Sequence, residues 1–177
     1  MGIKIEIPVR VVTFRSEELD KWRNGERENC KDSYCRKLPG TKGFGEFIVG
    51  RYFESLGYEW IHHDYNLFSG NRLGKYPVAE EVFRKHFGDE RYEQGRQFYR
   101  LFSPYVHVQE PDLMIYRPDF SEVRFAEVKR MDTNDRLNEA QLRGMALLKL
   151  LYGCEVDIFY VVEEGKDVPE RSVVWEF

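Results

Sequence analysis

The chain has 177 residues, a formal net charge of −4, 15% aromatic residues and 33% charged residues. These values are typical of one folded domain with a sizeable core, and they exclude a disordered chain and a strongly basic nucleic-acid coat protein. No apolar run approaches the roughly 20 residues of a membrane-spanning helix, and the N-terminus lacks the apolar core of a signal peptide. We therefore expect an intracellular protein, in the cytoplasm or nucleus, without a membrane partner. The three cysteines, which cannot all pair with one another, fit that reducing compartment.

The first half of the chain alternates between strand and helix patterns. Apolar residues recur at every second position after Ile3, which favours a β-strand, whereas the run around Phe44 repeats at helical spacing and stops before Gly57. The predicted elements are a strand over residues 3–14, a helix over 16–28 with Ser16 as its N-cap, a loop over 29–42, a helix over 42–56, a strand over 58–68 and a glycine-rich turn over 69–76.

The second half contains a long helical pattern and then runs of strongly β-forming residues. Its predicted elements are two helices over residues 78–102 broken at Gly88, strands over 106–116 and 123–130, a helix over 138–152, a strand over 155–162 and a last strand over 172–177. With residues 78–102 set aside as a helical insertion, the order from residue 42 onwards is α-β-β-β-α-β. We therefore expect an α/β protein in which residues 1–42 form an N-terminal extension of unknown role and residues 43–177 form the main domain.

The most informative segment runs from Glu110 to Lys129. Asp112 stands at the head of one apolar run, and Glu127 and Lys129 interrupt the next run. Because residues i and i+2 of a strand share a face, Glu127 and Lys129 emerge side by side. A hairpin centred near Phe120 brings Asp112 opposite this pair, since the paired positions of antiparallel strands have a constant sum. Two carboxylates and an amine then meet at one point, as a site for a divalent metal ion and a phosphate requires.

This combination fits the metal-assisted hydrolysis of a phosphodiester. Mg²⁺ prefers oxygen ligands and keeps several waters, so one or two carboxylates suffice to hold it. Asp112 and Glu127 fit that role, together with the backbone carbonyl of Val128. Lys129 fits contact with the phosphate and orientation of the attacking water. The alternative is a solvated Glu–Lys ion pair on an exposed strand face, which contributes little to stability.

Pro111-Asp112 followed by Glu127-Val128-Lys129, on an α-β-β-β-α-β core, resembles the motif of the PD-(D/E)xK nuclease superfamily. Within it, the segment from Glu110 to Gln141 is similar to the virus-type replication-repair nuclease (VRR-NUC) domain, and the resemblance covers about residues 43–163. It implies a restriction-endonuclease-like fold with a mixed sheet. It also implies a DNA endonuclease that depends on Mg²⁺ or Mn²⁺, leaves a 5′-phosphate, acts on branched DNA such as flaps and Holliday junctions during repair, and forms a homodimer.

The resemblance implies a role for each matching residue. Asp112 and Glu127 would be the metal ligands, and Lys129 the lysine of the motif. Glu46 matches the acidic residue that many members carry before the first core strand, and it would complete the metal site; alternatively it is a solvated helix residue. Gln141 matches a family glutamine close to the active site, although a glutamine three residues after an asparagine is also a helix capping box.

Basic residues supply two candidate DNA contacts. Arg130, Arg136 and Arg143 lie near the motif and are placed to clamp phosphates, and Arg130 replaces the glycine that usually follows the family's lysine. Residues 78–102 interleave basic with aromatic side chains, which favours either a DNA-tracking face or an amphipathic helix pair with one solvated side.

The rival functions are a restriction-type endonuclease on the same core and an inactive DNA-binding or assembly module of nuclease fold. We assign no catalytic role to the histidine pair at 62–63, because neighbours on a strand point to opposite faces.

Overall fold

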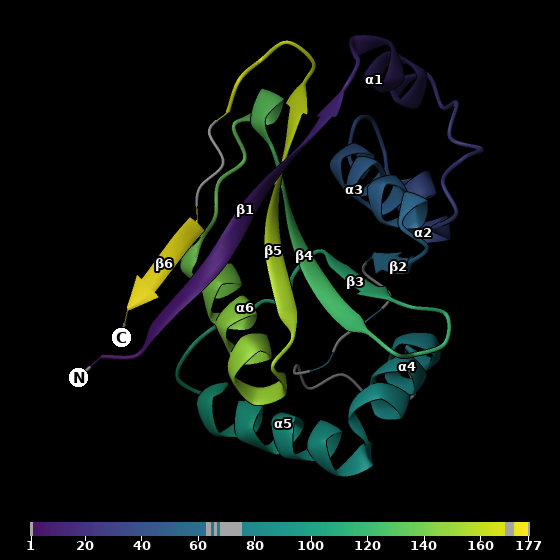
Figure 1. Ribbon diagram of the computed structural model, residues 1–177. Helices are drawn as coiled ribbons and strands as arrows, with labels where there is room; N and C mark the ends of the chain where they lie inside the picture. Colours follow the sequence, from purple (N-terminus) through teal and green to yellow (C-terminus); the bar gives the residue numbers. More distant parts are fainter. Residues whose placement is uncertain (1, 63–64, 66, 68–75, 169–171, 177) are drawn as a thin grey trace.

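The computed structural model describes residues 2–62, 65, 67, 76–168 and 172–176. It is an α/β structure built around one six-stranded mixed sheet (Figure 1). The strands are β1 (Lys4–Phe14), β2 (Glu59–His62), β3 (Leu113–Tyr116), β4 (Val123–Arg130), β5 (Glu155–Glu163) and β6 (Ser172–Glu176). The helices are α1 (Ser16–Arg23), α2 (Ser33–Lys37), α3 (Phe44–Ser55), α4 (Pro77–Phe87), α5 (Asp89–Phe102) and α6 (Glu139–Tyr152), and a 3₁₀ turn over Met131–Thr133 follows β4. Among the described residues, no helix is long and apolar enough to cross a membrane.

The sheet has the strand order β2-β3-β4-β5-β1-β6. β2, β3 and β4 pair antiparallel, β4, β5 and β1 pair parallel, and β6 is antiparallel to β1 at the far edge. The parallel step from β4 to β5 passes through α6, as a crossover between parallel strands requires. Residues 4–14 are part of this sheet, because β1 lies between β5 and β6.

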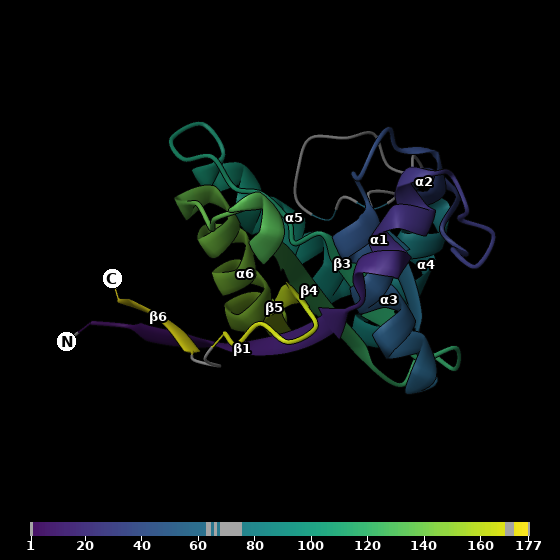
Figure 2. The ribbon, with the colours of Figure 1, turned by 90° about the horizontal axis from the view of Figure 1, so that it is seen from above.

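The sheet separates two apolar cores, because successive side chains of each strand point to opposite faces. On one face, Phe53 of α3 belongs to a buried cluster with Val128 of β4. On the other face, Met145 of α6 belongs to a buried cluster with Phe125 of β4. Figures 1 and 2 show α3 and α6 on either side of β4 and β5. Residues at the end of β4 therefore meet groups from both helical layers.

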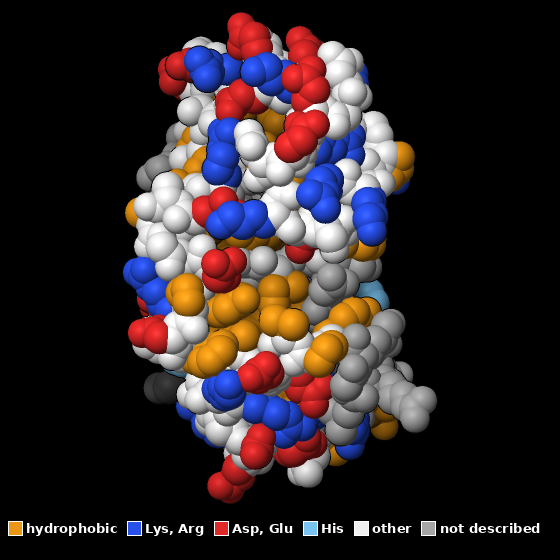
Figure 3. Space-filling view, turned by 90° about the vertical axis from the view of Figure 1, so that its right-hand side faces the viewer, with side chains coloured by type: hydrophobic (Ala, Val, Ile, Leu, Met, Phe, Trp, Pro, Cys, Tyr) orange, Lys and Arg blue, Asp and Glu red, His pale blue; other side chains and the backbone are white. Residues whose placement is uncertain are grey.

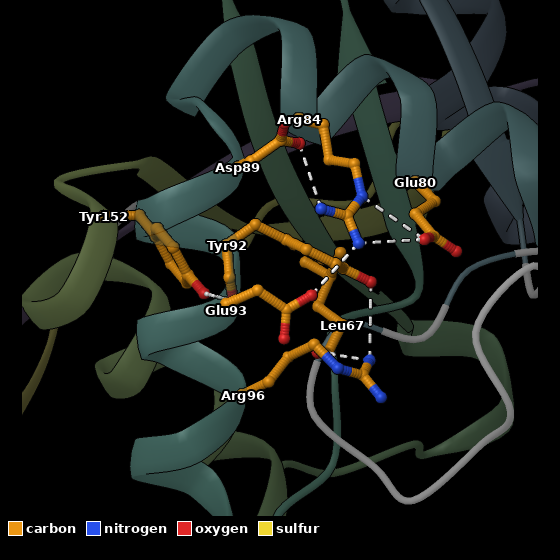
Figure 4. Close-up of polar contacts among 8 residues, drawn as sticks. All are labelled: Leu67, Glu80, Arg84, Asp89, Tyr92, Glu93, Arg96 and Tyr152. Carbon is orange, nitrogen blue, oxygen red and sulfur yellow. Dashed lines mark hydrogen bonds and ion pairs between the residues drawn. The ribbon is translucent and has the colours of Figure 1, made fainter.

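A polar cluster links the two helices of the insertion (Figure 4). Arg84 of α4 contacts the carboxylates of Glu80, Asp89 and Glu93, which span the junction of α4 and α5. The predicted break at Gly88 is confirmed, and this glycine has a φ of 87°, a conformation that other residues rarely adopt. Because three acids already surround Arg84, it is not a free cation for DNA.

Arg96 of α5 is also an internal group. It is buried, and it donates hydrogen bonds to the backbone oxygen of Leu67 and the hydroxyl of Tyr92. Next to it, Gly95 lets α5 approach α6 closely, because a Cβ at this position would lie 1.6 Å from the hydroxyl oxygen of Tyr152. These two arginines favour the interpretation of this segment as an amphipathic helix pair over that of a DNA-tracking face.

Two predictions for residues 16–42 are wrong. α1 is shorter than predicted, and its N-cap is Arg15 rather than Ser16, because the carboxylate of Glu18 accepts the Arg15 N–H at 2.9 Å. The predicted loop contains α2, which begins where the side chain of Asp32 accepts the N–H of Cys35 at 2.7 Å. A cap of this kind stabilises a helix too short to show a periodic apolar pattern.

The strand predicted over residues 106–116 is also too long. It begins only at Leu113, because the N–H of Gln109 bonds to the backbone oxygen of Ala140 near the start of α6 instead of a neighbouring strand. The strand predicted over 58–68 corresponds to β2, and most of its second half lies outside the described residues, as does nearly all of the turn predicted over 69–76. The remaining predicted elements are confirmed to within two residues.

Candidate active site at the open end of the β3–β4 hairpin

The β3–β4 hairpin opens where its hydrogen-bonded ladder ends. The two strands pair as far as Leu113 and Ala126, and β4 continues beyond this point. Asp112 lies at the opening, and its Oδ2 accepts the N–H of Val128 at 2.8 Å. The carboxylate thus replaces the bond that a longer β3 would supply to this N–H. This register confirms the prediction that Asp112 lies opposite the Glu-x-Lys triplet.

Glu127 and Lys129 are buried rather than solvated. Glu127 is 0% exposed and Lys129 is 3% exposed. Lys129 Nζ lies 2.8 Å from Glu127 Oε1 and 3.5 Å from Asp135 Oδ1. Apart from this ion pair, both Glu127 oxygens lack a hydrogen bond of good geometry within the described part of the chain, although an ionised carboxylate can accept several. The alternative of an ion pair on a solvated strand face is therefore wrong.

Negative charge exceeds positive charge at this point. Burial and repulsion from Asp112 raise the pKa of Glu127 well above its usual range, against the lowering effect of Lys129. Burial also raises the pKa of Asp112, which its bond from Val128 and the charge of Lys129 only partly offset. Burial alone would lower the pKa of Lys129, but the charges of Glu127 and Asp112 raise it. One ammonium group does not neutralise these acids, so an added cation would stabilise their charged forms.

Glu46 and His62 approach the same point from the α3 side of the sheet. Glu46 lies in the first turn of α3, where burial and then the charge of Asp112 raise its pKa, so it is not a fully solvated helix residue. The Nδ1 of His62 lies 3.0 Å from the backbone oxygen of Asp112, and its Nε2 lies 3.9 Å from Glu46 Oε1. His62 was not predicted as a site residue, because adjacent strand residues point to opposite faces, yet this histidine reaches the site without its neighbour.

Tyr65 is a further buried polar group near these acids. The residue is 7% exposed, its ring centroid lies 6.0 Å from that of Phe125, and its hydroxyl has no hydrogen-bond partner among the residues that the structure describes. Burial, and then the charges of Glu110, Asp112 and Glu127, raise its pKa well above the usual range, so the hydroxyl keeps its proton. Nothing in the sequence marks this tyrosine, because these neighbours meet it only in the folded chain.

Gln141 forms the predicted helix capping box. Its Oε1 accepts the N–H of Asn138 at 3.1 Å, and Asn138 Oδ1 accepts the N–H of Gln141 at 3.0 Å. The side chain is buried and its oxygen is already engaged. The capping role is therefore confirmed, whereas a role of Gln141 beside the active site stays a prediction, as does that of the Val128 carbonyl as a metal ligand.

Arg130 borders a polar cavity next to the acids. It donates to the backbone oxygen of Thr41 at 2.9 Å and pairs with Asp132, which together fix its guanidinium group. The cavity has a volume of about 320 Å³. Its lining consists of Leu38, Thr41, Lys42, Gly43, Glu46, Val128, Arg130, Thr133 and Asp135. The predicted contact of Arg130 with a phosphate is compatible with this position.

The two other predicted phosphate clamps lie on or near α6. Arg136 is exposed ahead of the helix, and Arg143 pairs with Glu139 one turn earlier in α6. On the face that Figure 3 shows, lysines and arginines are interspersed with acids, and hydrophobic side chains gather near the middle. In the described part of that face, no patch of one charge sign dominates. No observation tests the predicted DNA contacts of Arg136 and Arg143, which stay predictions.

The donor set has the chemistry that a hard divalent cation requires, because it consists of carboxylate oxygens and includes a buried carboxylate without hydrogen bonds. The candidate ligands are Asp112 and Glu127, to which Glu46 adds a third acid from α3. In the arrangement that the structure shows, the described residues contain no group of three or more His, Cys, Asp or Glu side chains that could hold a metal ion. No protein-family model, curated protein or solved structure matches this chain.

Proposed function

We propose that this protein is a metal-dependent nuclease that hydrolyses phosphodiester bonds in DNA. The observation that carries the proposal is the buried Glu127 carboxylate, which has unsatisfied lone pairs and lies beside Asp112 and Lys129. A divalent cation would satisfy this carboxylate and could at the same time bind a phosphate. The chain order α3, β2, β3, β4, α6, β5, with α4 and α5 as an insertion, supports a restriction-endonuclease-like core as part of the proposal.

Each side chain has a distinct part in this proposal. Asp112, Glu127 and Glu46 hold Mg²⁺ or Mn²⁺, which when bound supplies Lewis acidity and an activated water. Lys129 keeps its proton, because the nearby acids raise its pKa, and so it donates hydrogen bonds to a phosphate oxygen and to the attacking water. The N–H of Val128 holds the Asp112 carboxylate in place, so this group does not have to be ordered when substrate binds.

Selectivity for branched DNA is the part of the proposal that comes from the family resemblance. Flaps and four-way junctions are the substrates it implies. A homodimer would suit paired cuts on a four-way junction, since a two-fold axis places two copies of the site symmetrically. On this chain, Arg130 and Lys42 both border the cavity beside the acids, and Arg130 is the first candidate for contact with a flanking phosphate.

The test is cleavage of linear, flapped and four-way DNAs by the purified protein with Mg²⁺, Mn²⁺ or EDTA. We expect cleavage only with metal, and we expect Asp112→Asn, Glu127→Gln and Lys129→Ala each to lower the rate by about 10²-fold or more. Glu139→Gln is the matched control for Glu127→Gln, because it removes an exposed carboxylate of α6 by the same chemical change. Cleavage in EDTA, or full activity of Asp112→Asn, would refute the proposed site.

A further inference from the structure

Among the described residues, the buried polar atoms without a hydrogen bond of good geometry include the hydroxyl of Tyr65 and both carboxylate oxygens of Glu127, which lie at the proposed site. The others belong to Arg96, Arg124 and Asp157. Tyr65 packs against Phe125, which lies two residues before Glu127 on β4 and therefore on the same face of the sheet. Nearly all buried polar groups in folded proteins find a partner, so these atoms call for an explanation.

The tyrosine and the glutamate do not satisfy each other. Tyr65 is a donor and Glu127 is an acceptor, yet among the described residues the hydroxyl has no hydrogen-bond partner and the carboxylate has only its ion pair with Lys129. A metal ion alone would satisfy Glu127 but not Tyr65, because a phenol that keeps its proton is a poor ligand for Mg²⁺. Mg²⁺ retains several of its waters, however, and such a water can donate a hydrogen bond to the phenol oxygen. A hydrated cation therefore satisfies both residues at once.

We propose that Tyr65 is a positioning residue of the metal site, whose protonated hydroxyl accepts a hydrogen bond from a metal-bound water. Asp112 and Glu110 are the other acids whose charge reaches the hydroxyl. This inference rests on the proposed function, because it requires a divalent cation at Glu127. It adds a group outside the motif, which reaches the metal only through water and makes no contact with the phosphate.

Tyr65→Phe removes only the hydroxyl and keeps the ring that packs on Phe125. We expect the affinity for Mg²⁺, measured by calorimetric titration of the full chain with the metal alone, to fall about 10-fold, as is typical when an outer partner of a metal site is lost. We expect the unfolding temperature in EDTA not to fall, because the substitution removes an unsatisfied buried group. If Tyr65 were purely structural, Tyr65→Phe would leave the affinity for Mg²⁺ unchanged and would lower the unfolding temperature in EDTA.

Tyr58→Phe is the matched control. The hydroxyl of Tyr58 donates to Glu122 Oε2 at 2.7 Å, at the turn end of the β3–β4 hairpin and away from the acids. Removing it should lower the unfolding temperature slightly, because a made hydrogen bond is lost, and should leave the affinity for Mg²⁺ unchanged.

The outcomes separate this inference from the proposed function. Lower Mg²⁺ affinity in Tyr65→Phe but not in Tyr58→Phe supports the inference whatever the DNA substrate, because the titration contains no DNA. Equal affinity of Tyr65→Phe and the unaltered protein overturns the inference, while the nuclease proposal stands if the unaltered protein still cleaves DNA with metal. An unaltered protein that binds no divalent cation overturns both.

Discussion

Gly50 is the residue through which the packing of α3 reaches the candidate site. A Cβ at this position would lie 2.3 Å from Cε2 and 2.6 Å from Cδ2 of Trp60 on β2. The indole cannot turn aside, because it is buried and its Nε1 donates to Glu54 Oε1 at 2.8 Å. Since carbon atoms in contact are about 3.5–4.0 Å apart, Gly50→Ala should push α3 away from β2 by about 1 Å. Glu46 lies one turn before Gly50 and His62 lies two residues after Trp60, so the same shift should alter the spacing of the site.

The change in folding stability that Gly50→Ala causes is the sum of two opposing contributions. Overpacking a dense core costs about 1–3 kcal/mol, and contact with a fixed indole ring places this substitution near the upper value. Alanine in place of glycine inside a helix stabilises by about 1 kcal/mol. The expected net loss is about 2 kcal/mol, which lowers the melting temperature of a domain of this size by roughly 4–8 °C.

Thermal unfolding in EDTA measures this loss, and a double-mutant cycle identifies its cause. Trp60→Leu removes the ring atoms that the new methyl group would meet, so Gly50→Ala should cost much less in that background. Ser55→Ala, at the exposed end of α3, controls for helix propensity away from Trp60, since it removes only an exposed hydrogen bond to the backbone oxygen of Tyr52. The reasoning is refuted if Gly50→Ala is as stable as the unaltered protein, or if its cost is the same with and without Trp60.

Two further predictions concern a buried ion pair and a buried thiol. Asp157 is fully buried and pairs with Arg124 and with the more exposed Arg10. Asp157→Ala should cost about 3–5 kcal/mol in denaturant unfolding and Arg10→Ala under about 1 kcal/mol, and equal costs would contradict this assignment. Burial raises the pKa of Cys154 to about 12. Its thiolate is therefore about 10⁻⁴ of the population at pH 8, and a thiol reagent should label it only after unfolding; rapid labelling of the native protein would count against its burial.

The placement of Asp112 opposite the Glu-x-Lys triplet was predictable because it depends on local features only. Alternating apolar residues set two strands, and the turn residues between them set the register. The sheet position of residues 4–14 was not predictable in the same way. Their strand pattern is clear, but parallel pairing with β5 joins segments that are far apart in the chain and has no local pattern.

Tyr65 and His62 show the same limit within the site itself. Both come from the region of β2, and both reach the acids through packing that no spacing rule describes. His62 is fixed by Asp32, whose Oδ2 accepts the N–H of His62 while its Oδ1 caps α2. This aspartate thus ties β2 to a helix that the sequence pattern did not reveal, and the missed helix and the missed histidine have one physical cause.

Glu127 and Asp157 provide an internal comparison that bears on function. Both are fully buried acids on neighbouring strands, β4 and β5. Asp157 has two arginine partners, one of which Glu122 shares, whereas Glu127 has one lysine, which Asp135 shares. A buried charge without compensation destabilises a fold, and such departures are expected where they serve a site. Asp157, one strand away, has more positive charge beside it, although its Oδ1 also lacks a hydrogen bond of good geometry among the described residues. The imbalance of charge at Glu127 is therefore not a general property of this core, and a bound cation is the group that would remove it.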